Sequence, residues 1–115
     1  MPSEPMQIER LDRGVLSFHG PLTMENAPLF MNAVRREAAP TMILDLSGVP
    51  YLDSSGLGSL VAASTSCTKS GRRMALTGVN KWVQKVFEIT RVEGVFLTFD
   101  TLAEAIEALT NAGTA

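Results

Sequence analysis

Apolar residues along the chain follow two periods, one typical of β-strands and one typical of α-helices. Five segments show the two-residue alternation or the short apolar run expected of strands. They are residues 6–11, 15–20, 41–47, 72–78 and 95–99. The third, TMILDLS, is almost continuously apolar, as expected of a central strand buried on both faces. Asp12-Arg13-Gly14, between the first two segments, predicts a hairpin turn.

Four stretches between or after these strands show the 3.6-residue period of amphipathic helices. Their predicted first or capping residues are Asn26, Ser54, Asn80, and Asp100 or Thr101. One face of the first helix is expected to carry Ala27, Phe30, Met31, Val34 and Ala38. The second helix is expected to stop at Gly71, because glycine readily adopts the left-handed conformation found after helix ends.

The alternation of strands and helices predicts an α/β fold with right-handed crossovers between strands. A length of 115 residues fits one domain, which we expect to span residues 1–115. Hydrophobic residues make up 45% of the chain, which is sufficient for one continuous core. In open α/β sheets the functional loops follow the carboxyl ends of the strands, so the strand-to-helix junctions are where functional residues are expected.

Charge and hydropathy exclude several classes of function. The formal net charge is −2, the isoelectric point is about 5.3, and the basic residues are scattered, which argues against non-specific nucleic-acid binding. No apolar run approaches the ~18–20 residues that span a bilayer, and the first residues lack the pattern of a signal peptide. We therefore expect a cytoplasmic protein without direct nucleic-acid binding or membrane insertion.

Reactive side chains do not form a catalytic or metal-binding pattern. Cys67 is the only cysteine, which excludes an intramolecular disulfide and a cysteine-based metal cluster, and we expect it in the core. His19, the only histidine, is interpreted as a partly buried strand residue. Asp45 and Asp53 lie eight positions apart and do not suggest an acid/base pair. We expect no enzymatic activity, no cofactor and no metal.

The junction Asp53-Ser54-Ser55-Gly56 lies between the apolar strand and the second helix. One interpretation is structural: Ser54 or Ser55 caps the helix by accepting a hydrogen bond from a free amide of its first turn. The other is phosphorylation. A phosphate adds roughly −1.5 to −2 charges, which a helix N-terminus tolerates while the surface beside Asp53 changes sharply.

Residues 43–60, ILDLSGVPYLDSSGLGSL, resemble the signature of STAS-domain proteins, particularly the small bacterial anti-sigma factor antagonists. The resemblance extends over essentially the whole chain, because the two opening strands, the GPLT loop at residues 20–23 and the tail at residues 83–106 also match the family. It implies a mixed central sheet of about five strands, with about four helices packed mainly against it.

The resemblance also implies a function. The unphosphorylated antagonist binds an anti-sigma factor that is also a serine kinase, and thereby releases a sigma factor. The kinase uses ATP to phosphorylate the first serine after the aspartate, here Ser54, and a metal-dependent serine/threonine phosphatase resets the switch. The partner-binding residues implied in this way are Thr23, Asp53, Ser54, Ser55, Gly56, Leu57 and Gly58.

These residues are expected to differ in their roles. Asp53 would orient or help to recognise the phosphorylated serine, while Ser55 and Gly56 would shape the loop. Leu57 and Gly58 would belong to the docking surface at the start of the second helix.

One position departs from the family pattern. Many antagonists carry an acidic residue in the loop after the second strand, where this chain has Thr23 in Gly20-Pro21-Leu22-Thr23. The departure leaves an alternative open, in which the chain is a STAS scaffold or transport-associated module of a larger signalling or membrane complex, without a dedicated sigma cycle. Thr23 itself is expected to cap the following helix, with a second phosphorylation site as the other interpretation.

Overall fold

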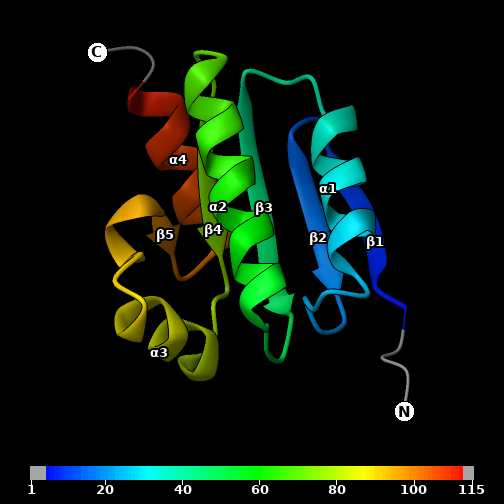
Figure 1. Cartoon of the computed structure of the whole chain (residues 1–115). Coiled ribbons are helices and arrows are strands. Elements are labelled where there is room, and N and C mark those ends of the chain that lie inside the picture. Colours follow the sequence, from blue (N-terminus) through cyan, green and yellow to red (C-terminus); the bar gives the residue numbers. More distant parts are fainter. Residues whose placement is uncertain (1–4, 113–115) are drawn as a thin grey trace.

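A five-stranded sheet organises the chain in the computed structural model, which describes residues 5–112 (Figure 1). Its strands are β1 (Gln7–Asp12), β2 (Val15–His19), β3 (Thr41–Gly48), β4 (Arg73–Thr77) and β5 (Thr98–Phe99). The strands lie in the same order in the sheet as in the sequence. β1 pairs antiparallel with β2, and all other neighbours are parallel, so the predicted mixed sheet is confirmed.

Four helices cover the two faces of this sheet. They are α1 (Ala27–Arg36), α2 (Ser54–Lys69), α3 (Lys81–Ile89) and α4 (Leu102–Ala112), and a single 3₁₀ turn, η1 (Glu93–Val95), precedes β5. Along β3 the side chains alternate, so that Met42 and Leu44 face the core shared with α1 and α2, while Ile43 faces α4. Because both faces of β3 are covered, its sequence is almost continuously apolar.

Three helix boundaries are fixed by interactions that the sequence predicted. The amides of Gly71 and Arg72 donate to carbonyls of the last turn of α2, and Gly71 has a φ of 71°, which makes it the expected glycine stop. Asn80 caps α3 by accepting from the amide of Val83 at 2.8 Å. Thr101 caps α4 and exchanges hydrogen bonds with Glu104, so it is Thr101 rather than Asp100 that begins this helix.

Two predicted boundaries are wrong. α1 ends at Arg36, so Ala38 is exposed and does not continue the apolar face of the helix. The expected strand at residues 95–99 shortens to Thr98–Phe99. Phe96 packs against Phe87 of α3 instead, with ring centroids 4.9 Å apart, and this contact holds the preceding segment away from regular sheet pairing.

The only cysteine and the only histidine also have clear positions. Cys67 is buried on the inner side of α2, as predicted, and burial raises the pKa of its thiol. His19 lies at the end of β2 and is exposed rather than partly buried, and its Nε2 lies 3.0 Å from the hydroxyl of Ser17.

Candidate functional site

The carboxyl ends of three parallel strands, β2, β3 and β4, lie at the same edge of the sheet, and the loops that follow them meet there (Figure 1). The loop before α2 is joined to the loop before α1 by backbone hydrogen bonds. The amide of Leu22 donates to the carbonyl of Tyr51 at 3.0 Å, and the amide of Asp53 donates to the carbonyl of Leu22 at 3.2 Å. The predicted junction is therefore built into this edge as expected.

Asp53 is the residue that fixes the start of α2. Its Oδ1 accepts a hydrogen bond from the amide of Gly56 at 2.8 Å, and its Oδ2 accepts one from the amide of Met24 at 2.9 Å. These two bonds stabilise the ionised carboxylate and lower the pKa of Asp53 below its ordinary value. One side chain therefore caps α2 and holds the neighbouring loop against it.

The prediction that Ser54 or Ser55 caps α2 is wrong. Asp53 has the extended backbone of an N-cap residue, and Ser54 and Ser55 are the first two residues of the helix. Both serines are exposed, and within residues 5–110 their hydroxyl groups make no hydrogen bond. The helix is capped without them, so both hydroxyl groups are available to an approaching protein.

The two glycines of this turn have different surroundings. Gly56 is buried against the loop before α1, and an added Cβ would collide with the backbone carbonyl oxygen of Leu22. Gly58 is exposed, and nothing lies within 4 Å of the place its Cβ would occupy. Gly56 is thus required by packing, whereas Gly58 leaves an open surface beside the half-buried Leu57.

Thr23 lies in the adjacent loop. The prediction that its side chain caps α1 is wrong. Asn26 occupies the position before the helix, and the backbone carbonyl of Thr23 accepts from the amides of Asn26 and Ala27 at 3.0 and 2.7 Å. The hydroxyl group of Thr23 is buried and has no hydrogen-bond partner among the described residues. The loop before α1 therefore supplies backbone contacts to the site.

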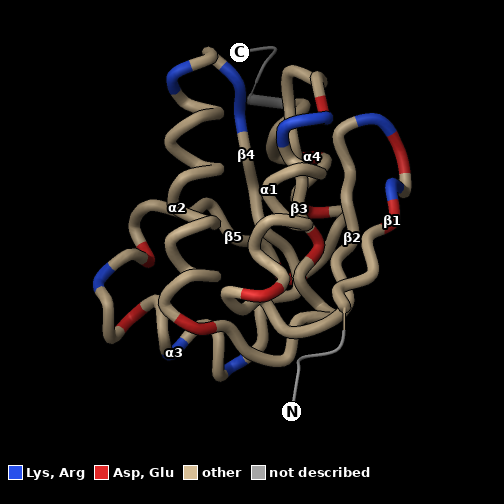
Figure 2. The backbone as a smooth tube through the Cα atoms, turned by 45° about the vertical axis from the view of Figure 1, so that its right-hand side comes forward, with Lys and Arg blue, Asp and Glu red and all other residues tan. Residues whose placement is uncertain are grey.

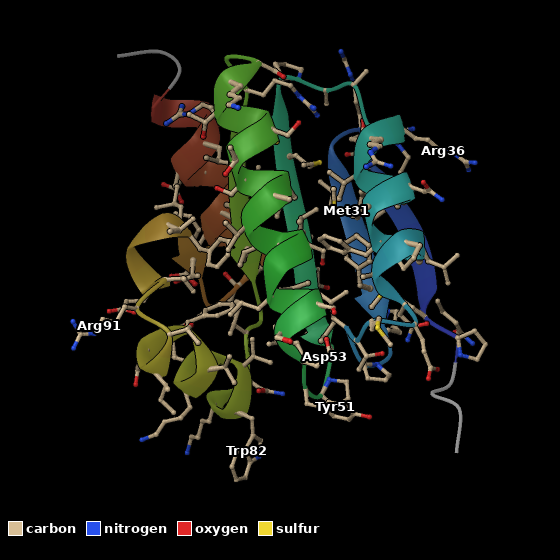
Figure 3. All side chains as sticks on the ribbon, viewed as in Figure 1. Met31, Arg36, Tyr51, Asp53, Trp82 and Arg91 are labelled. Carbon is tan, nitrogen blue, oxygen red and sulfur yellow. The ribbon has the colours of Figure 1, made fainter. Side chains whose placement is uncertain are left out.

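Large apolar side chains lie exposed at the end of the molecule that carries the serine junction. Trp82 is 76% exposed, Met24 68% and Tyr51 52%, and Figure 3 shows Tyr51 and Trp82 at the same end of the molecule as Asp53. We call these three residues the apolar rim. A cavity of about 460 Å³ lies beside two of them, Tyr51 and Trp82, and is lined by Pro50, Tyr51, Leu52, Trp82 and Val86.

The apolar rim was not predicted, although the sequence carries a signal for part of it. Trp82 lies outside the stripe of Val83, Val86 and Phe87 that packs α3 against the core. A tryptophan on the polar side of an amphipathic helix is unusual, since exposed aromatic residues often mark protein contacts.

The carboxylates do not form a catalytic pair. Asp45 accepts from the hydroxyl of Ser17 and the amide of Ser47, whereas Asp53 is engaged with Gly56 and Met24, so the two acids have separate partners. Within the described residues no group of His, Cys, Asp and Glu side chains is arranged to hold a metal ion. The geometry of the edge suits protein recognition, with exposed hydroxyls beside an anion and an apolar rim.

Comparisons with known proteins identify the family of the chain. A family model described as the STAS domain matches residues 5–105. A relative from Thermotoga maritima, provisionally named an anti-sigma factor antagonist, is 34% identical over 90 residues, which cover 75% of this chain and 80% of the relative. The chain belongs to the STAS domain family.

Solved structures show the same fold. The crystal structure of a Thermotoga maritima protein with the same provisional name has a TM-score of 0.76 and 30% identity, and the match covers 90% of this chain and 92% of that chain. The phosphorylated form of the Bacillus cell fate determinant SpoIIAA has a TM-score of 0.64 and 21% identity, covering 90% and 98% of the two chains.

A sulfate transporter family protein from Wolinella succinogenes has a TM-score of 0.77 and 21% identity, covering 93% of each chain. At this identity, as for SpoIIAA, the likeness shows the fold alone. In the described part of this chain, no helix combines the length and the apolar character needed to cross a membrane.

Proposed function

We propose that this chain is an anti-sigma factor antagonist that acts by phosphorylation-controlled partner switching. The unphosphorylated chain binds an anti-sigma factor that is also a serine kinase, and the sigma factor is released. The kinase uses ATP to phosphorylate Ser54, and a serine/threonine phosphatase removes the phosphate. The chain itself acts by binding and catalyses none of these steps. Membership of the STAS family and the provisional names of its relatives support this proposal.

The observation that carries the proposal is the division of roles between Asp53 and Ser54. Asp53 caps α2, while Ser54 is exposed at the first helical position without a hydrogen bond in the described chain. A kinase can therefore take the hydroxyl of Ser54 into its active site without breaking any interaction that holds the fold.

A phosphate at this position would change recognition more than folding. The free amides and positive dipole end of the first turn of α2 favour an anion, so the helix tolerates the modification. The same phosphate would stand beside the carboxylate of Asp53, and a partner packed there would have to desolvate two neighbouring anions. The expected result is loss of the partner from an intact domain.

The apolar rim fits the docking surface that such a switch needs. Tryptophan, tyrosine and methionine are enriched in protein interfaces. Tyr51 and Trp82 are exposed at the same end of the molecule as Asp53, and the amide of the exposed Met24 is bonded to Asp53. We place the kinase contact over Ser54, Leu57 and this rim.

The alternative is a scaffold or transport-associated module without a sigma cycle. The observation in its favour is that Thr23, with a buried hydroxyl, stands where many antagonists have an acid. A module of this kind would bind its partners regardless of the state of Ser54.

The test compares partner capture by five baits: wild type, Ser54→Ala, Ser54→Asp, and the matched controls Ser55→Ala and Ser55→Asp. Each bait is incubated with lysate of the source organism, and captured proteins are identified by mass spectrometry. A captured protein with an ATPase-type kinase domain is then purified and mixed with the chain and ATP, and the phosphorylated residue is mapped.

Partner switching predicts that wild type, Ser54→Ala and both Ser55 variants retain the kinase, while Ser54→Asp loses it. It also predicts phosphate on Ser54 alone, and none on the Ser54→Ala variant. Equal capture of the same partners by all five baits would instead support the scaffold or transport-associated function.

A further inference from the structure

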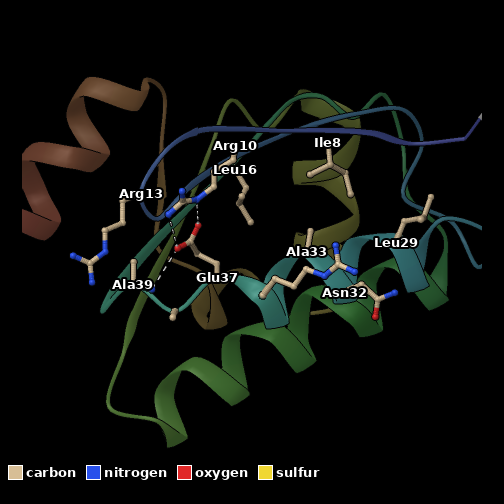
Figure 4. Close-up of a pocket in the computed structure, with 11 residues that line it drawn as sticks. Ile8, Arg10, Arg13, Leu16, Leu29, Asn32, Ala33, Glu37 and Ala39 are labelled. Atoms are coloured by element: carbon tan, nitrogen blue, oxygen red, sulfur yellow. Dashed lines mark hydrogen bonds and ion pairs between the residues drawn. The ribbon is translucent and has the colours of Figure 1, made fainter.

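A second cavity lies between the edge strand β1 and helix α1, and neither Ser54 nor Ser55 lines it (Figure 4). Its volume is about 510 Å³, within the ~300–1,000 Å³ range typical of small-molecule sites. We call it the β1–α1 groove. It is lined by Ile8, Arg10, Arg13, Leu16, Leu29, Asn32, Ala33, Arg36, Glu37, Ala38 and Ala39.

The floor of the β1–α1 groove is apolar. Ile8 and Leu16 come from neighbouring strands, where Arg10 is the register partner of Leu16, while Leu29 and Ala33 come from α1. Leu29 is 43% exposed and Ile8 and Ala33 are partly exposed, so this apolar surface faces solvent. Covering it with hydrocarbon would remove apolar area from water and favour binding.

The rim of the groove is basic. Three arginines line it, Arg10, Arg13 and Arg36, against the single carboxylate of Glu37, which leaves a formal charge of +2 around the groove in a chain of net charge −2. Figure 2 shows Lys and Arg segments in the β1–β2 turn and at the end of α1, at the same end of the molecule. The groove is therefore a local basic surface on an acidic protein.

The three arginines of the groove differ in whether they form an ion pair. The Nε of Arg10 donates to the buried carboxylate of Glu37 at 2.8 Å, and this ion pair neutralises the one acidic group in the groove. Among the described residues neither Arg13 nor Arg36 has an ion-pair partner. Two guanidinium groups are thus left for an external anion.

We infer that the β1–α1 groove binds a small amphiphilic carboxylate, with its anionic head on the free arginines and its hydrocarbon tail over Ile8, Leu16, Leu29 and Ala33. Of the two free arginines, Arg13 lies toward one end of the groove, while Ile8 and Leu29 lie toward the other (Figure 4). A basic rim beside an apolar floor fits one anionic head and one hydrocarbon tail. The tail can be alkyl or aryl.

This inference is independent of the proposed function. Arg36 is the last residue of α1, whereas the contact of the serine junction with this region is made by Met24, before the helix begins. A helix of this length separates them by about 15 Å. Binding in the groove is measured without a kinase, so either proposal can fail alone.

The test is a titration of the ¹⁵N-labelled full chain, followed by amide chemical shifts. The probes are octanoate and 4-phenylbutyrate, which separate an alkyl from an aryl tail, with acetate, octanol and octylammonium as controls. We expect saturable shifts at Ile8, Leu16 and Ala33 with octanoate, phenylbutyrate or both. Acetate lacks the tail, octanol the charge and octylammonium the correct sign, so all three should bind more weakly.

Arg36→Gln and Arg35→Gln form a matched pair of variants. Both remove a positive charge from the last turn of α1, but only Arg36 lines the groove. Arg36→Gln should weaken carboxylate binding by about threefold to fivefold, the effect of one exposed ion pair, while Arg35→Gln should leave it unchanged. Circular dichroism of each variant verifies that α1 is intact.

Three results would overturn the inference. Octanol or octylammonium binding as tightly as octanoate would show that the arginines do not select an anion. Equal weakening by the two arginine variants would show a general charge effect. Concentration-dependent self-association that covers these amides in the absence of probe would show that a second copy of the chain occupies the groove.

Discussion

The amide of Met24 donates a hydrogen bond of 2.9 Å to the carboxylate of Asp53, across 29 positions of sequence. The same carboxylate caps α2 through Gly56. Asp53 thus couples the loop before α1 to the first turn of α2. Met24, whose amide it holds, and Ser54, which follows it in the sequence, are both exposed. This coupling gives the first prediction.

Asp53→Ala should lower the free energy of unfolding by about 0.5–2 kcal/mol, because it removes the N-cap of α2. Asp53→Asn should fall between wild type and Asp53→Ala. Its amide oxygen can cap Gly56, but its NH₂ group cannot accept from Met24. Urea denaturation followed by circular dichroism gives the three values.

Ser54→Ala is the control for this series. We expect a change within about 0.5 kcal/mol, as for an exposed substitution that breaks no named interaction. A larger loss from Ser54→Ala than from Asp53→Ala would contradict the assignment of Asp53 as the cap.

The depressed pKa of Asp53 predicts a pH dependence of stability. Its carboxylate stabilises the folded chain fully above the unfolded-state pKa of about 3.9, and this contribution is lost as pH falls through the lower folded-state pKa. The pKa of Glu37 is lowered as well, chiefly by its hydrogen bond from Arg10, and acts in the same direction.

The difference in unfolding free energy between wild type and Asp53→Asn isolates the contribution of Asp53 from that of Glu37, because Glu37 is present in both chains. It should be constant between about pH 7 and 5 and should shrink below about pH 4, where the unfolded chain binds a proton at Asp53 before the folded chain does. Denaturant titrations at several pH values provide the measurement. A difference that stays constant down to the acid transition would be inconsistent with an ionised cap.

The two glycines of the turn give a third prediction. Gly56→Ala should destabilise the chain strongly, because the new Cβ collides with the backbone of Leu22, which cannot yield as a flexible side chain could. Gly58→Ala should stabilise it by about 0.5–1 kcal/mol, since alanine is favoured over glycine inside a helix and the site is open. Thermal unfolding of both variants measures the contrast, and similar effects at the two positions would refute it.

Gly58→Ala also probes the proposed interface. If the kinase packs closely against the start of α2, the added methyl group should weaken kinase binding while it raises stability. Opposite signs of the two effects would separate recognition from folding, and unchanged binding would place the contact away from Gly58.

Trp82 provides a reporter, because it is the only tryptophan in the chain and is 76% exposed. Its fluorescence should be quenched readily by iodide in the free protein and should shift to the blue when a partner covers the apolar rim. Trp82→Ala should change the stability by less than about 0.5 kcal/mol. In the proposed interface it should nevertheless weaken partner binding by about 1 kcal/mol or more, whereas Lys85→Ala on the same helix should not.

The sequence was informative about the fold because local periodicity carries most of that information. The buried run of β3, the helical spacing of α3 and α4, and the caps at Asn80 and Thr101 all depend on neighbours along the chain. The segment at residues 95–99 was harder, since the contact of Phe96 with Phe87 competes with strand pairing and involves a different element.

The sequence predicted that the Asp53–Gly56 junction lies between β3 and α2, as it does, but not the internal arrangement of this junction. Asp53, Ser54 and Ser55 are all good capping residues, and spacing alone cannot decide which of them ends the extended segment. Asp53, the residue that caps α2, also accepts a hydrogen bond from the amide of Met24. This contact joins two loops and forms only in the folded chain, so the sequence does not reveal it. Exposure of Tyr51 and Trp82 is likewise a property of tertiary packing.

The burial of Cys67 has a practical consequence for site-specific labelling of the protein. The only thiol in the sequence is buried on the inner side of α2 and has a raised pKa, so it should react slowly with alkylating reagents while the chain is folded. A cysteine introduced at an exposed site, such as position 24 or 36, could then carry a fluorophore or spin label by itself. The native cysteine therefore need not be replaced before a label is attached at a single chosen site.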